Sequence, residues 1–224
     1  MFKLTRLGLI AAVVLTGIAM TLYPGGTFFH RAGHGYSFFQ NSLSDLGSTV
    51  AWNGQTNPGS LFHLGACIVL VMAGCTGLLA LVAVYSSSLR TRGLTRAAGI
   101  AVVVAGVALV GAAVTPQDRQ PELHGQFSLL AIGSFAMGTA LLAATTALDA
   151  RFRRRVPICW SLLTLIVLAW ASVMLSAHPT SDLELAIPVT LQKIVAITLV
   201  ATLVFQSYEA ERVAVPGAMT TKAG

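Results

Sequence analysis

Apolar residues dominate six long stretches of this 224-residue chain, and short polar segments separate the stretches. Each stretch is at least about 17 residues long, which is enough for a helix to cross a hydrocarbon core of about 30 Å. The predicted spans cover residues 7–23, 59–85, 97–115, 123–147, 157–176 and 186–206. The pattern predicts an all-α bundle of six transmembrane helices. It forms one membrane domain, residues 1–208, and we expect the remaining tail, residues 209–224, to be disordered.

The composition agrees with lipid as the solvent of most of the chain. Hydrophobic residues make up 55% of the sequence and charged residues only 10%, whereas soluble domains carry about 25% charged residues. Small residues recur inside the spans, for example Ala105 and Ala108 in the third and Gly133 and Gly138 in the fourth. Small residues let helices approach one another closely in a membrane, so these positions predict helix contacts.

The basic residues are distributed unequally between the two sides of the predicted bundle. One side holds 11 of the 14 Lys and Arg residues, which are Lys3, Arg6, Arg90, Arg92, Arg96, Arg151, Arg153, Arg154, Arg155, Arg212 and Lys222. The positive-inside rule then places both termini in the cytoplasm of a multi-pass protein of the cell inner or plasma membrane. This unequal distribution accounts for the net charge of +6 as a signal of membrane topology. The sequence shows no pattern of residues that would read or stack on nucleic-acid bases, so nucleic acid is not expected as a partner.

Polar and ionisable residues gather at the opposite, outer side. The segment "NSLSDLGS" after the first span contains Ser44 and Asp45, and Asp118 precedes the fourth span. His63 lies about one turn into the second span, and His124 opens the fourth. Ionisable groups at a membrane edge are costly and are therefore candidates for function.

Three interpretations of this outer cluster stay open. The first is a hydrogen-bond network that ties helix ends together, with Asp45 as a helix cap. The second is a pocket that binds a lipid head group or a small polar solute. The third is a zinc site of Asp45, His63 and His124, because imidazole and carboxylate are the ligands of catalytic zinc. The leading function is that of a non-catalytic membrane protein whose outward pocket binds a lipid head group or a small polar solute. The alternatives are a metal-dependent hydrolase that acts on lipid and a small-solute transporter, so the residues leave open whether the protein is an enzyme.

Lys193, in "TLQKI" of the last span, bears on this choice. A lysine inside an apolar span needs a polar partner or must extend toward water. We expect Lys193 to lie within ion-pair distance of Asp45 or Asp118, and the adjacent Gln192 to supply a donor and an acceptor. An ammonium group in the cluster would disfavour a nearby zinc ion by charge repulsion.

Three short motifs also resemble a known family. "NSLSDLGS", "TPQD" followed by "ELHG", and "TLQKI" are similar to segments of the DUF998 family of bacterial and archaeal integral membrane proteins, over roughly residues 7–207. This family has no assigned function. In the motifs, "TPQD" stands where the family usually has FP-x-D, and Lys193 stands where it often has Arg. The resemblance implies that the family's polar positions are Ser44, Asp45, Gly47, Asp118, His124, Gln192 and Lys193.

Overall fold

The computed structural model describes residues 1–85, 89–176 and 178–214, and every long element in these residues is a helix. The helices are α1 (Phe2–Leu22), α2 (Gly59–Tyr85), α3 (Leu89–Val114), α4 (Pro121–Leu148), α5 (Arg155–Ser176) and α6 (Asp182–Ala214). All six are long and apolar enough to cross a membrane. The prediction of an all-α, six-span bundle is thus confirmed.

The observed helices extend beyond several predicted spans, because a helix can continue past the apolar core into water. The third begins at Leu89 instead of residue 97, and the sixth continues to Ala214 instead of 206. The expectation of disorder is therefore wrong for residues 209–214, where Glu209 accepts hydrogen bonds from Arg212 one helical turn later. Residues 215–224 of the predicted tail lie outside the described part of the chain.

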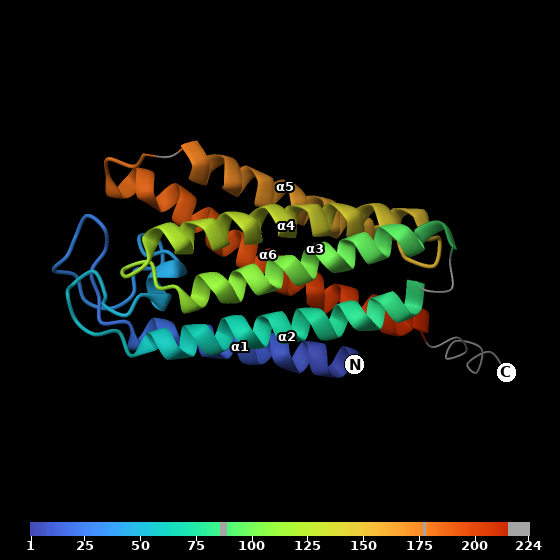
Figure 1. Cartoon of the computed structure of the whole chain (residues 1–224), viewed down its shortest axis with the longest axis horizontal. Coiled ribbons are helices and arrows are strands. Elements are labelled where there is room, and N and C mark those ends of the chain that lie inside the picture. The colour runs from blue at the N-terminus through green and yellow to red at the C-terminus, as the bar shows by residue number, and fades with distance from the viewer. Residues whose placement is uncertain (86–88, 177, 215–224) are drawn as a thin grey trace.

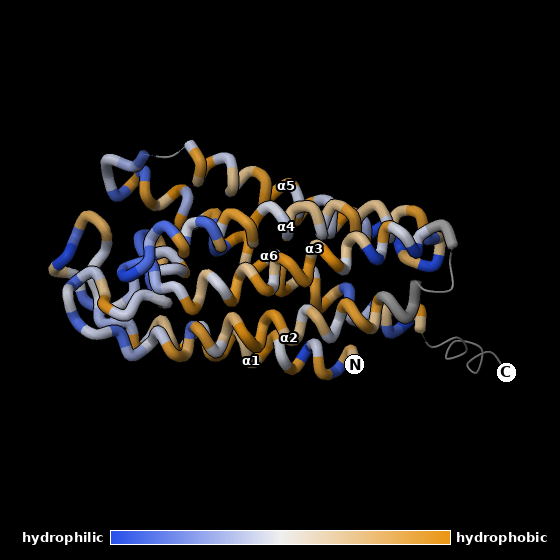
Figure 2. Tube along the Cα trace, viewed as in Figure 1, coloured by the Kyte–Doolittle hydropathy of each residue, from blue (hydrophilic) through white to orange (hydrophobic). Residues whose placement is uncertain are grey.

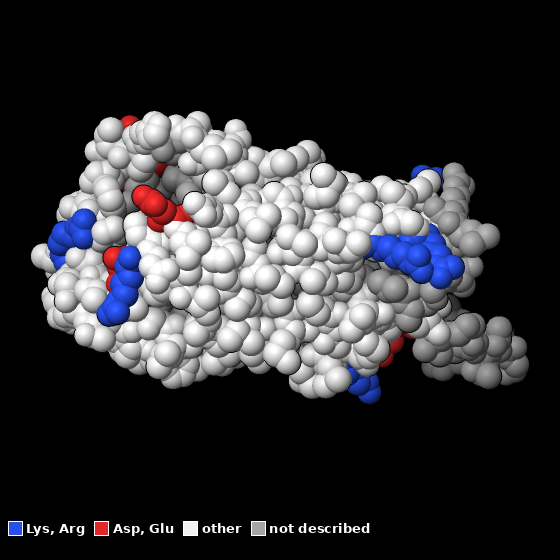
Figure 3. All heavy atoms as spheres, in the orientation of Figure 1, with Lys and Arg blue, Asp and Glu red and all other residues white. Residues whose placement is uncertain are grey.

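The six helices form a ring. Each helix packs against the next one along the chain, and α6 returns to pack against α1 and α2 (Figure 1). α1 begins and α6 ends at the same end of the bundle, where Arg6 forms a 2.9 Å ion pair with Glu211. Apolar segments run along the middle of the helices and polar segments lie at the two ends (Figure 2). Figure 3 shows a broad central band of the visible face without charged side chains, as a membrane-spanning protein requires.

Residues 23–58, which we call the cap, cover the end of the ring opposite the termini (Figure 1). The cap contains a short 3₁₀ helix, η1 (Ser44–Gly47), and two buried asparagines that replace regular secondary structure as hydrogen-bonding centres. The Asn57 side chain donates to the carbonyls of Leu46 and Ser48 and accepts from the amide of Gly59, where α2 begins. The cap is therefore an ordered part of the fold rather than a solvated loop.

Candidate functional site

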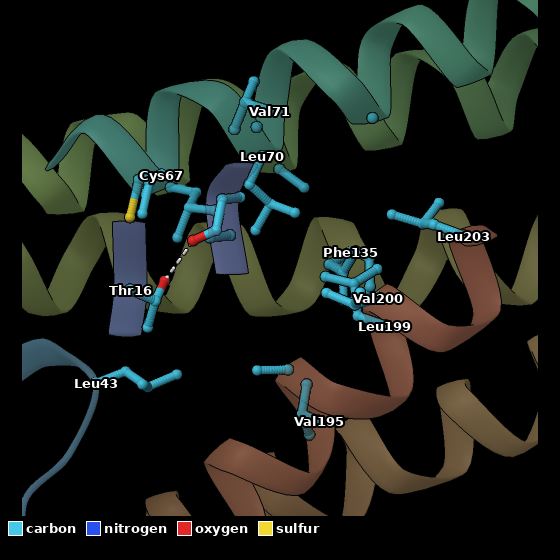
Figure 4. A pocket seen from close by; sticks show the side chains of 18 of the residues that line it. Thr16, Leu43, Cys67, Leu70, Val71, Phe135, Val195, Leu199, Val200 and Leu203 are labelled. Carbon is cyan, nitrogen blue, oxygen red and sulfur yellow. Dashed lines mark hydrogen bonds between the residues drawn. The ribbon is translucent and has the colours of Figure 1, made fainter. Parts of the chain in front are cut away.

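The ring encloses a cavity of about 800 Å³. It extends from Ser44 and Gly47 in the cap to Thr5 and Ser207 near the opposite end of the bundle. Figure 4 shows apolar side chains of α2 and α6, together with Phe135 of α4, around the same space, and Leu43 of the cap at one end of it. Residues of all six helices line the cavity, and most of them are apolar, so the cavity is long and largely apolar.

Polar side chains line this cavity mainly at the cap end. Five of them were candidates from the sequence, namely Ser44, His63, His124, Gln192 and Lys193, and Gln117 was not a candidate. Asp45 and Asp118, the two carboxylates of the predicted cluster, are absent from the described lining. The structure thus divides the predicted cluster into groups that face the cavity and groups that hold the cap.

Lys193 is 3% exposed, and its ammonium group lies between the cap and the cavity. Its Nζ atom donates to the carbonyl oxygen of Asn41 at 2.6 Å and to that of Val189 at 3.4 Å. Nζ also lies 5.5 Å and 5.1 Å from the ring centroids of Tyr36 and Phe38. These carbonyl and aromatic groups stabilise a positive charge without neutralising it.

The expected ion pair of Lys193 does not form in the described part of the chain, where neither Asp45 nor Asp118 is within ion-pair distance. Instead, Asn41 lies between two of the charges, since its backbone carbonyl accepts from Lys193 and its side-chain Nδ2 donates to Asp45 at 3.2 Å. The prediction of the ion pair was wrong because Asn41, a fully buried residue, takes the place of the carboxylate. The last helix, α6, nevertheless packs beside α1.

Asp45 stabilises the turn of the cap. Its Oδ2 atom accepts from the Ser42 amide at 2.8 Å, and the Ser42 hydroxyl accepts from the Asp45 amide at 3.1 Å. This reciprocal pair has the bonding pattern of a capping box, but Asp45 lies in the first turn of η1 and Leu43 is the residue at the cap position, so Asp45 is not itself the helix cap. Burial raises the pKa of Asp45, and the hydrogen bonds from Asn41 and Ser42 offset only part of that effect.

Asp118 joins the cap to the turn between α3 and α4. Its carboxylate accepts from the Thr49 amide at 3.0 Å, the Thr49 hydroxyl at 2.6 Å and the Val50 amide at 3.1 Å. Partial burial alone would raise the pKa of Asp118, but these hydrogen bonds outweigh it and hold the pKa below its usual value. Asp118 is therefore a tether of the cap.

The two cavity-facing histidines come from α2 and α4. Nδ1 of His124 lies 3.0 Å from the carbonyl oxygens of Ala112 and Thr115 at the end of α3, so Nδ1 carries a proton and donates it. Nδ1 of His63 is buried without a hydrogen-bond partner among the described residues. Nε2 of His63 lies 3.7 Å from the Cys67 sulfur.

The three residues considered for zinc have separate environments. Asp45 is engaged within the cap, whereas His63 and His124 face the cavity. Over the described ranges, no three His, Cys, Asp or Glu side chains gather closely enough to hold a metal ion. Zinc binding stays a sequence prediction, and metal analysis of protein purified without added metal tests it.

Sequence reasoning missed Asn41 and a polar contact deeper in the ring. Nε1 of Trp160 donates to Oε1 of Gln206 at 2.8 Å, and both residues line the cavity while being at most 3% exposed. Asn41 lies inside "NSLSDLGS", but a loop asparagine has no spacing that distinguishes a buried hydrogen-bonding centre. The polar Gln206 within an apolar span was the one signal for the deeper contact.

No protein-family model, curated protein or solved structure matches the chain. The resemblance to the DUF998 family stays a prediction that rests on the three motifs.

Proposed function

We propose that this protein binds a membrane lipid with an anionic head group, with an acyl chain in the cavity and the head group at Lys193. The observation that carries the proposal is a long apolar cavity whose single formal charge, among the described lining residues, is the buried ammonium group of Lys193. An amphiphile that is apolar along most of its length and negative at one end matches this cavity, since its tail would contact the apolar wall and its head group the ammonium group.

The size of the cavity supports this ligand class. Its volume of about 800 Å³ lies within the range of roughly 300–1,000 Å³ that is typical of small-molecule sites. Most of its lining consists of aliphatic and aromatic side chains such as Leu70, Phe135 and Leu199. An apolar space of this kind does not hold ordered water well, because water needs polar partners, whereas an acyl chain fills it.

The polar end supports the choice of an anionic head group. A lysine ammonium group has three donors, and two of those of Lys193 are directed at carbonyl oxygens. The third donor remains for a ligand, with Gln192, His63 and His124 on the same part of the wall. A tail that moves from the bilayer into an apolar cavity exchanges one apolar environment for another. Selectivity between lipids therefore has to come from the contacts of the head group at the Lys193 end.

The proposal is tested by exchanging purified protein into vesicles that contain equal amounts of phosphatidylglycerol and phosphatidylcholine. After re-isolation, the bound lipids are measured by mass spectrometry. We expect wild-type protein to retain phosphatidylglycerol at about one molecule per chain, and Lys193→Met to lower its enrichment over phosphatidylcholine by about tenfold or more. Such a change corresponds to about 1.4 kcal/mol of head-group interaction.

Two variants serve as controls. Lys193→Arg keeps the positive charge and should keep the enrichment, and Lys3→Met removes an exposed lysine of α1 that does not line the cavity. Inorganic phosphate, added at millimolar concentration, should not displace the lipid if the acyl chain contributes to binding. Equal enrichment in wild-type protein and Lys193→Met, or the absence of retained lipid from both, would overturn the proposal.

A further inference from the structure

The residues that line the cavity differ in exposure from helix to helix. Among the described residues that line it, those of α2, α3, α4 and α5 are all buried or half-buried. Only four lining residues within helices are exposed, and they belong to α1 and α6: Val13, Gly17, Ile197 and Ala201. Val13 is 53% exposed and Ile197 is 63% exposed although both also line the interior. Residues that border both the cavity and the surroundings mark an opening in the wall.

These exposed residues form two facing stripes. Val13 and Gly17 are four residues apart on α1, and Ile197 and Ala201 are four residues apart on α6, so each pair lies on one face of its helix. Lys193 precedes Ile197 by the same interval and therefore continues the α6 stripe toward the cap. At Gly17, an added Cβ atom would meet no other atom within 4 Å. The two stripes therefore border an open space that leads to the ammonium group.

The other exposed lining residues lie at the cap end, where the passage is obstructed. Phe38 and Gln117 are exposed there. The cap is held across this end by the bond from Lys193 to Asn41, by the 2.7 Å bond from the Leu43 amide to Gln192, and by the contacts of Asp118 with Thr49. A lipid that used this path would have to break these bonds and pass its tail through water, which the hydrophobic effect strongly opposes.

We infer that the opening between α1 and α6, bordered by Val13, Gly17, Ile197 and Ala201, is a lateral portal through which a membrane lipid enters the cavity directly from the bilayer. This inference rests on the proposed lipid binding. The tail stays in apolar surroundings throughout, and the stripe that ends at Lys193 leads the head group to its site. The glycine and alanine leave room for the chain to pass between the helices.

Trp160 provides a reporter for a tail inside the cavity. Its side chain lines the cavity and is 2% exposed, so lipid that surrounds the protein cannot reach it. The changes Trp52→Phe and Trp170→Phe leave Trp160 as the single tryptophan of the chain. Nε1 of Trp170 has no hydrogen-bond partner in the described structure, so phenylalanine there removes no such bond. Bromine atoms on a lipid tail quench indole fluorescence at close contact.

The experiment mixes this single-tryptophan protein, in detergent-free nanodiscs, with vesicles of phosphatidylglycerol brominated on its tails, and it follows the quenching of Trp160 with time. We expect Gly17→Phe to slow the quenching at least tenfold, because the ring fills the portal without a clash. The matched control is Gly133→Phe on α4, where an added Cβ atom also meets nothing within 4 Å but the residue does not line the cavity. This control should keep the original rate, and both variants should keep the original thermal midpoint.

The outcomes separate this inference from the proposed function. Quenching at equal rates in Gly17→Phe and Gly133→Phe overturns the portal and leaves lipid binding standing. Faster quenching in Asp118→Asn, which loosens the cap, would place the path at the cap and likewise overturns the portal. If Trp160 is not quenched in any variant, no tail reaches the cavity, and the proposed lipid binding itself fails.

Discussion

Asp45 shows how a single buried carboxyl group acts in this protein. Its Oδ2 atom accepts from the Ser42 amide and from the Asn41 side chain, and the backbone carbonyl of Asn41 accepts from Lys193. Burial raises the pKa of Asp45 above its ordinary value of about 3.9. The folded state therefore binds this proton more tightly than the unfolded state. The stabilising contribution of that proton is present below about pH 3.9 and is lost as the pH rises through the higher folded pKa.

Two substitutions at Asp45 separate its hydrogen bonds from its charge. Asp45→Asn keeps an acceptor oxygen and removes the ionisation, so we expect a thermal midpoint at pH 7 that is equal to or above that of wild type. Asp45→Ala leaves the buried donors of Ser42 and Asn41 without this acceptor and should cost about 1–3 kcal/mol. Thermal unfolding in detergent between pH 4 and 8 measures both effects. Equal midpoints for the two variants would show that the hydrogen bonds are unimportant.

At the scale of the helices, small residues separate into those that contact a neighbour and those that do not. A Cβ atom at Gly138 of α4 would lie 2.9 Å from Cγ2 and 3.4 Å from the backbone nitrogen of Val102 on α3. Gly133, five residues earlier on the same helix, meets nothing within 4 Å. The two glycines look alike in the sequence, but only Gly138 permits the close packing of α3 on α4.

This difference predicts unequal effects of the same substitution. Gly133→Ala and Gly138→Ala gain the same helix propensity, so their difference reports the contact with Val102. We expect Gly138→Ala to be less stable than Gly133→Ala by about 1–3 kcal/mol, the usual cost of overpacking. Unfolding of both variants by denaturant in the same detergent gives this difference. A difference near zero would mean that α3 and α4 shift apart without cost.

At the scale of the whole molecule, the charges define two unlike ends. The cap covers one end, and the ion pair of Arg6 with Glu211 lies at the other, together with Arg151 and the other arginines between α4 and α5. The positive-inside rule predicts that this basic end faces the cytoplasm, with both termini. The cap and the polar end of the cavity would then face outward.

Cysteine labelling of intact cells tests this orientation. The native cysteines Cys67, Cys75 and Cys159 are first replaced by serine or alanine. A new cysteine at the exposed residue 54 of the cap should react with a membrane-impermeant reagent, and one at the exposed residue 154 should react only after the cells are opened. The reverse pattern would contradict the predicted topology and place the Lys193 end of the cavity on the cytoplasmic side.

The sequence by itself determined the six spans, because a backbone in lipid must satisfy its hydrogen bonds within a helix and apolar length reports this directly. It also identified Ser44, His63, His124, Gln192 and Lys193 as polar groups of one end, since their chain positions follow from the span boundaries. The sequence did not predict that α6 continues to Ala214, because the polar last turns of this helix do not add to the apolar length of the span.

Only the tertiary structure decided which of these groups share a surface. Asn41 meets Lys193 across 152 positions of the chain, and Leu43 meets Gln192 across 149, so their contacts depend on how the cap folds back over the ring. The same packing assigns Asp45 and Asp118 to the cap, makes Lys193 the charged residue of the described cavity lining, and leaves the space beside Gly17 open. Periodicity along one chain carries no information on such distances, because they are set by the fit of side chains between helices.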